Sequence, residues 1–148
     1  MPEPETKPVT VVDASGLVLG RAASLIAKKL LRGEAVSVIN ADKSVIVGSK
    51  EAILREFRER RARGGLRKGP WYPRMPDKIF KRAVRGMLPY QKGNGRAAYK
   101  RLRVYIGVPA DLKNVKPETL EPSRCRSAVS SMSLGSISQH LGANITTK

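Results

Sequence analysis

A row of cationic side chains in residues 74–89 carries the clearest chemical signal in the sequence. Lys78, Arg82 and Arg85 recur at three- and four-residue spacing, which puts them on one side of a helix. Lys81 widens that charged side. Guanidinium and ammonium groups in such a row form ion pairs and hydrogen bonds with phosphate oxygens. The segment therefore predicts an RNA-binding surface.

A turn at residues 16–21 offers a different chemistry, the binding of phosphate by backbone amides. It lies between a predicted strand and a predicted helix, where N–H groups and the helix dipole favour anions. A Walker loop needs four residues between its glycines and then Lys and Ser or Thr, whereas three residues separate Gly16 from Gly20, and Arg21 and Ala22 follow. Three interpretations stay open: tight-turn packing, an RNA phosphate bound with Arg21, and a nucleotide site.

Residues suited to catalysis or metal binding are few. Asp13 and Asp42 follow predicted strands, where open α/β sheets place ligand sites, but aspartates there commonly accept hydrogen bonds from their own turn. His140 and Cys125 are the single residues of their types, and their surroundings contain no metal or nucleophile motif. We therefore predict that the protein is not an enzyme and has no metal or other cofactor.

Three aromatic residues, Trp71, Tyr72 and Tyr99, are interleaved with cations. Flat rings beside arginines can stack on exposed bases, but aromatic residues in loops also anchor those loops to a core. Pro70 and Pro73 flank Trp71 and favour anchoring for that residue. The surrounding glycine-rich loop, residues 62–73, has the backbone freedom to adapt to a partner.

The cationic row requires a helix to hold it, and the sequence supplies the signals for one. Pro76 suits a first turn because its missing N–H would have no intrahelical partner, and Asp77 complements the helix dipole. Gly86 and Pro89 end the helix. The apolar residues that share its other side are Ile79, Phe80, Ala83, Val84 and Met87.

Other segments predict a sheet covered by helices. Expected strands occupy residues 9–12, 36–39, 45–48 and 102–108, and expected helices occupy 21–31, 50–63 and 96–101, with a helical turn at 136–141. Ser49 is the expected N-cap of the second helix, and residues 91–95 are an expected mobile loop. Strands that alternate with helices favour parallel pairing through right-handed crossovers.

Charge defines the class of partner. The chain carries 29 Lys and Arg against 12 Asp and Glu, a net charge of +17. Residues 50–103 hold 18 of these cations and only four of the acids. A field of this strength repels itself unless a polyanion neutralises it. Nucleic acid is the predicted partner, and an anionic membrane surface is the alternative.

One domain is expected over residues 1–148, because a chain of this length can bury roughly 70% of its unfolded surface. Residues 1–8 read as a flexible lead-in rather than a signal peptide, 9–109 as the α/β core, and 110–148 as an extension wrapped on it. The lone cysteine cannot form an internal disulfide, and no apolar run approaches the ~20 residues that span a bilayer. A soluble cytoplasmic protein is expected.

Several motifs occur in the order found in one family of ribosomal proteins. They are residues 11–14 (VVDA), 16–21 (GLVLGR), 38–41 (VINA), 47–50 (VGSK), 74–89 and 102–105 (LRVY). With them the chain resembles the universal large-ribosomal-subunit protein thirteen family, in its archaeal and eukaryotic branch. The resemblance implies a three-layer α/β/α fold with a four-stranded parallel sheet. It also implies a structural role in the ribosome without catalytic activity or a small-molecule substrate.

That resemblance further implies binding to large-subunit ribosomal RNA, early assembly, and contacts with neighbouring ribosomal proteins. The RNA contacts carried over by motif are Arg21, Arg58, Arg61, Arg63, Arg67, Lys68, Arg74, Lys78, Lys81, Arg82 and Arg85. Charge alone adds Lys92, Arg96 and Lys100. Most of these contacts are expected to reach phosphates, so that specificity comes from RNA shape.

Two rival functions are open at this point. The first is a small nucleotide-binding transferase or hydrolase that uses residues 16–21, which calorimetry with ATP and GTP would reveal as saturable binding. The second is a nucleic-acid chaperone that coats DNA and RNA alike. Displacement of the protein from large-subunit RNA by duplex DNA at equal phosphate concentration would favour the chaperone.

Overall fold

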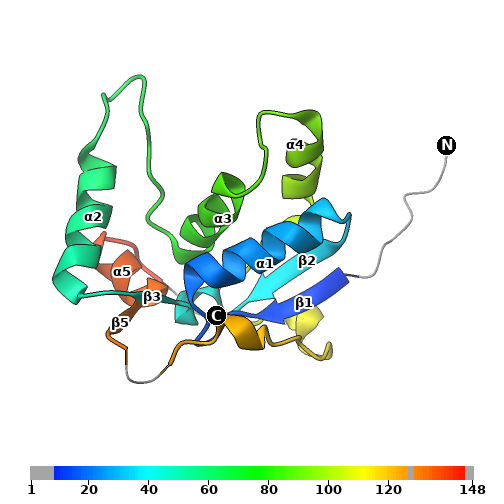
Figure 1. Ribbon diagram of the computed structural model, residues 1–148. Coiled ribbons are helices and arrows are strands. Elements are labelled where there is room, and N and C mark those ends of the chain that lie inside the picture. Colours follow the sequence, from blue (N-terminus) through cyan, green and yellow to red (C-terminus); the bar gives the residue numbers. More distant parts are fainter. Residues whose placement is uncertain (1–8, 127–128, 146–148) are drawn as a thin grey trace.

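A three-stranded parallel sheet organises the chain. The computed structural model describes residues 9–126 and 129–145 (Figure 1). Strand β2 (Ala35–Ile39) lies between β1 (Val9–Asp13) and β4 (Leu102–Val104), and both neighbours run parallel to it. The fold is thus mixed α/β, as predicted from the alternation of strands and helices. The predicted lead-in at residues 1–8 lies outside the described residues.

The prediction of four parallel strands was wrong. Strand β3 (Val45–Val47) does not join the sheet but pairs antiparallel with β5 (Ser131–Ser133), a strand that the sequence did not predict. The link from β2 to β3 contains only a 3-10 turn (Ala41–Lys43) and two flanking residues. A parallel neighbour needs a crossover of a dozen or more residues, so β3 has to leave the sheet.

Strand β4 is shorter than the predicted 102–108. It ends at Val104, and the chain then bends across the carboxyl end of β2. Gly107 has a φ of +71°, a backbone conformation that favours glycine, and its carbonyl accepts a hydrogen bond of 2.9 Å from the Asn40 amide. Its own amide donates to Asp42 Oδ1 at 3.3 Å. The turn closes this end of the sheet.

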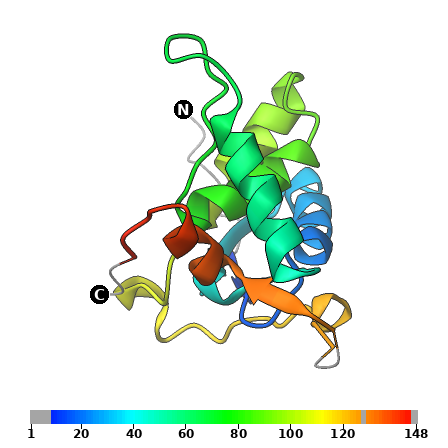
Figure 2. The same cartoon turned by 90° about the vertical axis from the view of Figure 1, so that its left-hand side faces the viewer.

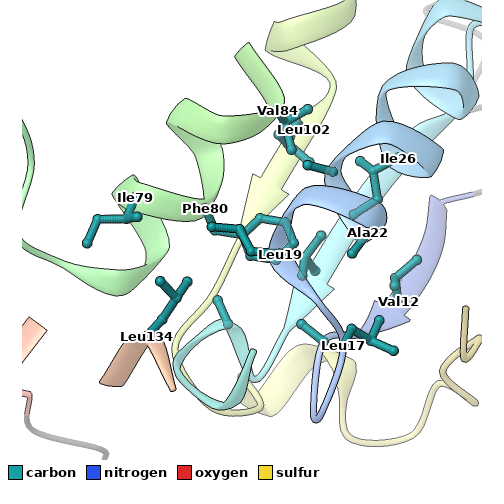
Figure 3. Close-up of a cluster of buried hydrophobic side chains, with 14 of the residues drawn as sticks. Val12, Leu17, Leu19, Ala22, Ile26, Ile79, Phe80, Val84, Leu102 and Leu134 are labelled. Atoms are coloured by element: carbon teal, nitrogen blue, oxygen red, sulfur yellow. The ribbon is translucent and has the colours of Figure 1, made fainter. Parts of the chain in front are cut away.

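Two helices pack against each other beside the sheet. Helix α1 (Leu19–Leu31) buries Ala22 and Ile26, and it contacts α3 (Pro76–Gly86), which in turn contacts β4. Figure 3 shows Phe80 of α3 pointing toward the side chains of α1. Phe80 is fully buried. The core therefore fixes the position and rotation of α3.

The predicted start of α3 at Pro76 and its end at Gly86 are confirmed. Met87, however, was predicted on the buried side and is 44% exposed. Because the helix ends at Gly86, Met87 no longer follows the helical spacing. Leu88, the next residue, is 6% exposed and is buried instead.

Helix α4 (Gly93–Lys100) replaces most of the mobile loop predicted at residues 91–95. Its start is held by Arg96, which donates hydrogen bonds to the carbonyls of Tyr90 (3.2 Å) and Gln91 (3.4 Å). Gly95 is buried, and a Cβ built on it would lie 2.0 Å from the Pro89 carbonyl oxygen. The glycine permits this close approach between α4 and the preceding turn.

Helix α2 (Lys50–Ala62) begins at the predicted cap, where Ser49 Oγ accepts a hydrogen bond from the Ala52 amide. It buries Ile53 and Phe57. Helix α5 (Leu134–His140) includes most of the predicted helical turn and lies beside α2, as Figure 2 shows.

Residue Glu118 of the C-terminal extension pairs with β1, since its amide donates to the Val11 carbonyl at 2.7 Å.

Candidate nucleic-acid interface

Helix α3 carries its apolar and cationic residues on different sides. Its large apolar side chains at Ile79, Phe80 and Val84 are buried. Its predicted RNA-binding residues are Lys78, Lys81, Arg82 and Arg85. Lys78 and Arg85 are exposed, whereas Lys81 and Arg82 are half-buried. None of the four forms an ion pair with an acid among residues 9–126 and 129–145. Their charges are available to an external anion.

Three of these cations each lie over a tyrosine ring. The distances from cation to ring centre are 4.7 Å for Arg82 and Tyr72, 4.2 Å for Arg85 and Tyr90, and 5.0 Å for Lys81 and Tyr99. Such cation–π contacts are favourable by about 0.5–1 kcal/mol at exposed sites. The tyrosines restrict the cations to one side of α3 before any ligand binds.

Tyr90 and Tyr99 also contact each other, with ring centres 5.4 Å apart in an edge-to-face arrangement. Burial raises the pKa of the Tyr99 hydroxyl, and the positive charges of Arg85 and Arg82 only partly offset this. The hydroxyl therefore stays neutral at physiological pH. The ring presents no negative charge that would compete with a phosphate for Lys81.

Tyr72 anchors the loop before α3 to α2. Its ring packs edge-to-face on Phe57, with centres 5.9 Å apart, and its hydroxyl accepts a hydrogen bond from Arg60 Nη1 at 3.3 Å. Arg60 also pairs with Glu56. Burial alone would lower the pKa of Arg60. Its interactions with Tyr72 and Glu56 raise that pKa by more, so the net shift is upward. Our sequence reasoning missed Arg60, although its position three residues after Phe57 placed it beside that ring.

Trp71 does not anchor the loop, contrary to the prediction. Its side chain is 70% exposed, whereas the neighbouring Tyr72 is half-buried and packs against the core. The indole lies against the backbone of Gly69, where an added Cβ would be 3.3 Å from Trp71 Cδ2. The Trp71 carbonyl accepts a hydrogen bond of 3.2 Å from Arg82 Nη1. The main chain at Trp71 is thus held next to the cationic side of α3.

Three adjoining hollows surround that side of α3. The large hollow has a volume of about 530 Å³ and is lined by residues that include Arg82, Arg85, Leu88, Pro89, Tyr90 and Lys92. The apolar hollow, of about 470 Å³, includes Leu19, Val45, Phe57, Arg60, Tyr72 and Arg82. The small hollow, of about 210 Å³, is lined by Pro73, Lys78, Lys81, Arg82, Arg85 and Tyr99. Arg82 borders all three.

The loop between α2 and α3 carries a second group of predicted contacts. Arg63, Arg67 and Lys68 are all exposed on it, and Figure 1 shows the loop extending beyond the end of α2. Its tip is closed by two backbone hydrogen bonds between Gly65 and Gly69, of 3.0 and 3.2 Å. Arg74, nearer to α3, donates to the Gly142 carbonyl at 3.4 Å. The structure therefore gives Arg74 an internal partner.

The remaining predicted contacts are more dispersed. Arg58 and Arg61 are exposed on α2, Arg21 is exposed in the first turn of α1, and Lys100 is exposed at the end of α4. None of these four lines the hollows described above. Lys92 joins Arg82 and Arg85 in the large hollow, whereas Arg96 uses its guanidinium to hold the turn before α4.

The first half of the turn at residues 16–21 uses its amides internally. The amides of Gly16, Leu17 and Val18 donate to the carbonyls of Lys43, Ala14 and Ser123, at 3.1, 3.1 and 2.7 Å. These groups have no free N–H to offer a phosphate. Packing therefore accounts for residues 16–18, whereas the first amides of α1 are not used internally within the described part of the chain, so the interpretation of an anion bound beside Arg21 stays open.

The two aspartates stabilise turns at the end of the sheet. Asp13 Oδ1 accepts hydrogen bonds from the Ser15 amide (3.0 Å), Ser15 Oγ (2.8 Å) and Asn40 Nδ2 (3.0 Å). Burial raises the pKa of Asp13, but these bonds and the charge of Lys43 lower it by more. Asp42 accepts from Gly107, as described above. Within the described ranges, no three His, Cys, Asp or Glu residues gather as a metal site would require.

Comparison with known proteins identifies the family. A statistical description of the family "Ribosomal protein L13" matches residues 7–111, which include β1 to β4 and α1 to α4. The chain belongs to the ribosomal protein L13 family. This confirms the resemblance drawn from the motifs. In the described part of this L13 chain, no helix is both long enough and apolar enough to cross a membrane.

Archaeal relatives named "Large ribosomal subunit protein uL13" match nearly the whole chain. The one from Methanosarcina barkeri is 48% identical over 138 residues, which cover 91% of this chain and 99% of the relative. The relative from Methanosphaera stadtmanae is 45% identical, and the match covers 91% of this chain and 98% of the relative. The relative from Archaeoglobus fulgidus is 46% identical, and the match covers 90% of this chain and 87% of the relative. These matches confirm the predicted archaeal-like branch of the L13 family.

Proposed function

We propose that this protein is a structural component of the large ribosomal subunit that binds large-subunit ribosomal RNA through α3 and the loops around it. The cation row of α3 carries this proposal, because its charges face outward and have no acidic partner in the part of the chain that the structure describes, while Phe80 on the other side is fixed in the core. The names of the L13 relatives support the assignment to the large subunit.

RNA binding in this proposal needs no chemical step. The sheet and the buried sides of α1 and α3 hold the helix rigid, so Arg82 and Arg85 meet phosphates from adjoining RNA segments in a fixed arrangement. Lys78, Lys81 and Lys92 extend the row, and the exposed loop cations Arg63, Arg67 and Lys68 reach RNA beyond the body. By joining separate RNA segments, the protein supports subunit assembly.

The other parts of the proposal follow from the ribosomal role. The protein works in the cytoplasm inside the ribosome, contacts neighbouring ribosomal proteins, and catalyses no reaction. It takes no cofactor, small-molecule substrate or membrane as a partner. Arg21, Arg58, Arg61, Arg74, Arg96 and Lys100 are peripheral RNA contacts in this proposal, with Arg74 and Arg96 also holding internal carbonyls.

A double substitution on α3 tests this function. We expect Arg82→Ala/Arg85→Ala to weaken binding to large-subunit ribosomal RNA by at least tenfold, measured by filter binding at moderate salt, while circular dichroism shows an unchanged fold. Lys113→Ala/Lys116→Ala, which removes two exposed cations from the extension, is the matched control and should bind nearly as wild type does. Equal losses in the two double variants would overturn the assignment of the surface to α3.

Duplex DNA provides the specificity arm of the same experiment. A protein that recognises ribosomal RNA by its shape should keep that RNA when duplex DNA is added at equal phosphate concentration. Displacement by the DNA would favour a general nucleic-acid chaperone.

A further inference from the structure

We infer that the hollows along α3 bind an unpaired stretch of RNA and that Trp71 stacks on one of its bases; this inference rests on the proposed function. The charge of the α3 surface alone does not distinguish unpaired RNA from paired RNA. Phosphate contacts by themselves would suit a duplex equally well.

The first argument is the exposure of Trp71. An indole that is 70% exposed gains little from the protein's own core, yet this one lies against the Gly69 backbone, and its own main-chain carbonyl is held by the Arg82 guanidinium. A rigid aromatic ring beside a cation is the arrangement on which proteins stack single-stranded bases. Paired bases inside an A-form helix offer no face for such stacking, so the partner has to be unpaired.

The second argument is the shape and chemistry of the hollows. The large and apolar hollows, of about 530 and 470 Å³, fall in the size range of about 300–1,000 Å³ that is typical of small-ligand sites. Each combines an aromatic ring with a guanidinium, Tyr90 with Arg85 and Tyr72 with Arg82. The ring holds the guanidinium in place, and the planar guanidinium can stack on an unpaired base or donate to its phosphate.

The third argument is continuity. Arg82 borders all three hollows and also donates to the Trp71 carbonyl, so one guanidinium joins the main chain at Trp71 to the hollows. A strand can therefore run past Trp71 and along α3 with successive phosphates near Arg82 and Arg85. Of the three hollows, only the apolar one has an acidic lining residue, Glu56, and that residue is paired with Arg60.

The test compares a short single-stranded oligoribonucleotide of mixed sequence with the duplex formed from it and its complement. Trp71 is the only tryptophan in the chain, so its fluorescence reports on the proposed contact directly. We expect the single strand to quench this fluorescence strongly and the duplex to quench it little. Poly-glutamate serves as the third probe, because an acidic peptide could also match the charges.

The variant arm uses Trp71→Ala in the full-length chain. Stacking energies predict a loss of affinity for the single strand of about 5- to 150-fold, with duplex affinity unchanged. Trp71→Phe, which keeps a ring, should lose less. Leu66→Ala is the matched control, since Leu66 is a 99% exposed apolar residue of the same loop that has no ring, and it should bind as wild type does.

Three results would overturn the inference: equal losses of single-strand and duplex affinity in Trp71→Ala, no loss of either, or quenching by poly-glutamate as strong as that by RNA. These results are distinct from failure of the proposed function. Suppose that Arg82→Ala/Arg85→Ala weakens binding to ribosomal RNA, but Trp71→Ala does not change the affinity for the single strand relative to the duplex. The proposed function then stands and only this inference fails.

Discussion

At the scale of single residues, Arg82 links the core helix to the proposed RNA surface. Its guanidinium lies over the Tyr72 ring, donates to the Trp71 carbonyl and borders three hollows. A side chain that is already restrained loses less conformational entropy when it binds a phosphate. In the proposed function, the tyrosines beside α3 favour RNA binding by restraining the cations that meet the phosphates.

Phe80 determines which side of α3 faces outward, and its substitution makes a prediction at this scale. The side chain is fully buried, so Phe80→Ala should lower the free energy of unfolding by about 3–5 kcal/mol, measured by urea denaturation. Met87→Ala removes a 44% exposed side chain after the end of the helix, so the free energy of unfolding should change by less than about 0.5 kcal/mol. Similar losses in the two variants would contradict the division of α3 into buried and cationic sides.

At the scale of elements, the docking of α4 depends on one close approach. The Gly95 backbone approaches the Pro89 carbonyl so closely that no side chain fits between them, and this turn also carries Tyr90 and the end of α3. The same packing thus sets the position of the large hollow relative to Arg85.

Two glycines of α4 provide a matched test of that packing. In Gly95→Ala the new Cβ would lie 2.0 Å from the Pro89 oxygen, so the turn must move, and we expect a loss of unfolding free energy of about 1–3 kcal/mol. A Cβ at Gly93 meets nothing within 4 Å, so Gly93→Ala should be neutral or stabilising by up to about 1 kcal/mol. Thermal denaturation measures both. Loss of the same size in both variants would contradict the assignment of the cost at Gly95 to the close approach.

Local signals were enough to predict the elements that present the site. Pro76 and Gly86 mark the ends of α3, Ser49 caps α2, and the apolar spacing identified the side of each helix that packs inward. The partner of β3 depends instead on β5, more than 80 residues away, and neither short strand has a pattern that identifies the other. Loop residues were equally hard to predict, because contacts from α2 and α3 decided that Tyr72 and not Trp71 packs against the core.

At the scale of the whole molecule, the excess of cations is organised rather than uniform. Among residues 9–126 and 129–145, the ion pairs are Lys29–Glu118, Arg60–Glu56 and Arg124–Glu121. Most of the Lys and Arg within these ranges therefore have no acidic partner there. Part of this charge lies on α3 and the adjoining loop, and the cations of α3 face outward because the core packs on the other side of the helix. The account predicts that this charge is neutralised by RNA.

The dependence of RNA affinity on salt measures that neutralisation most directly. The logarithm of the association constant for large-subunit ribosomal RNA should fall linearly with the logarithm of salt concentration, by about 0.7–0.9 per phosphate contacted, so ten contacts give a slope of roughly −7 to −9. In Arg82→Ala/Arg85→Ala the slope should become shallower by about 1.4–1.8, because two contacts are lost. A wild-type slope near zero, or a slope that the double substitution leaves unchanged, would contradict the account.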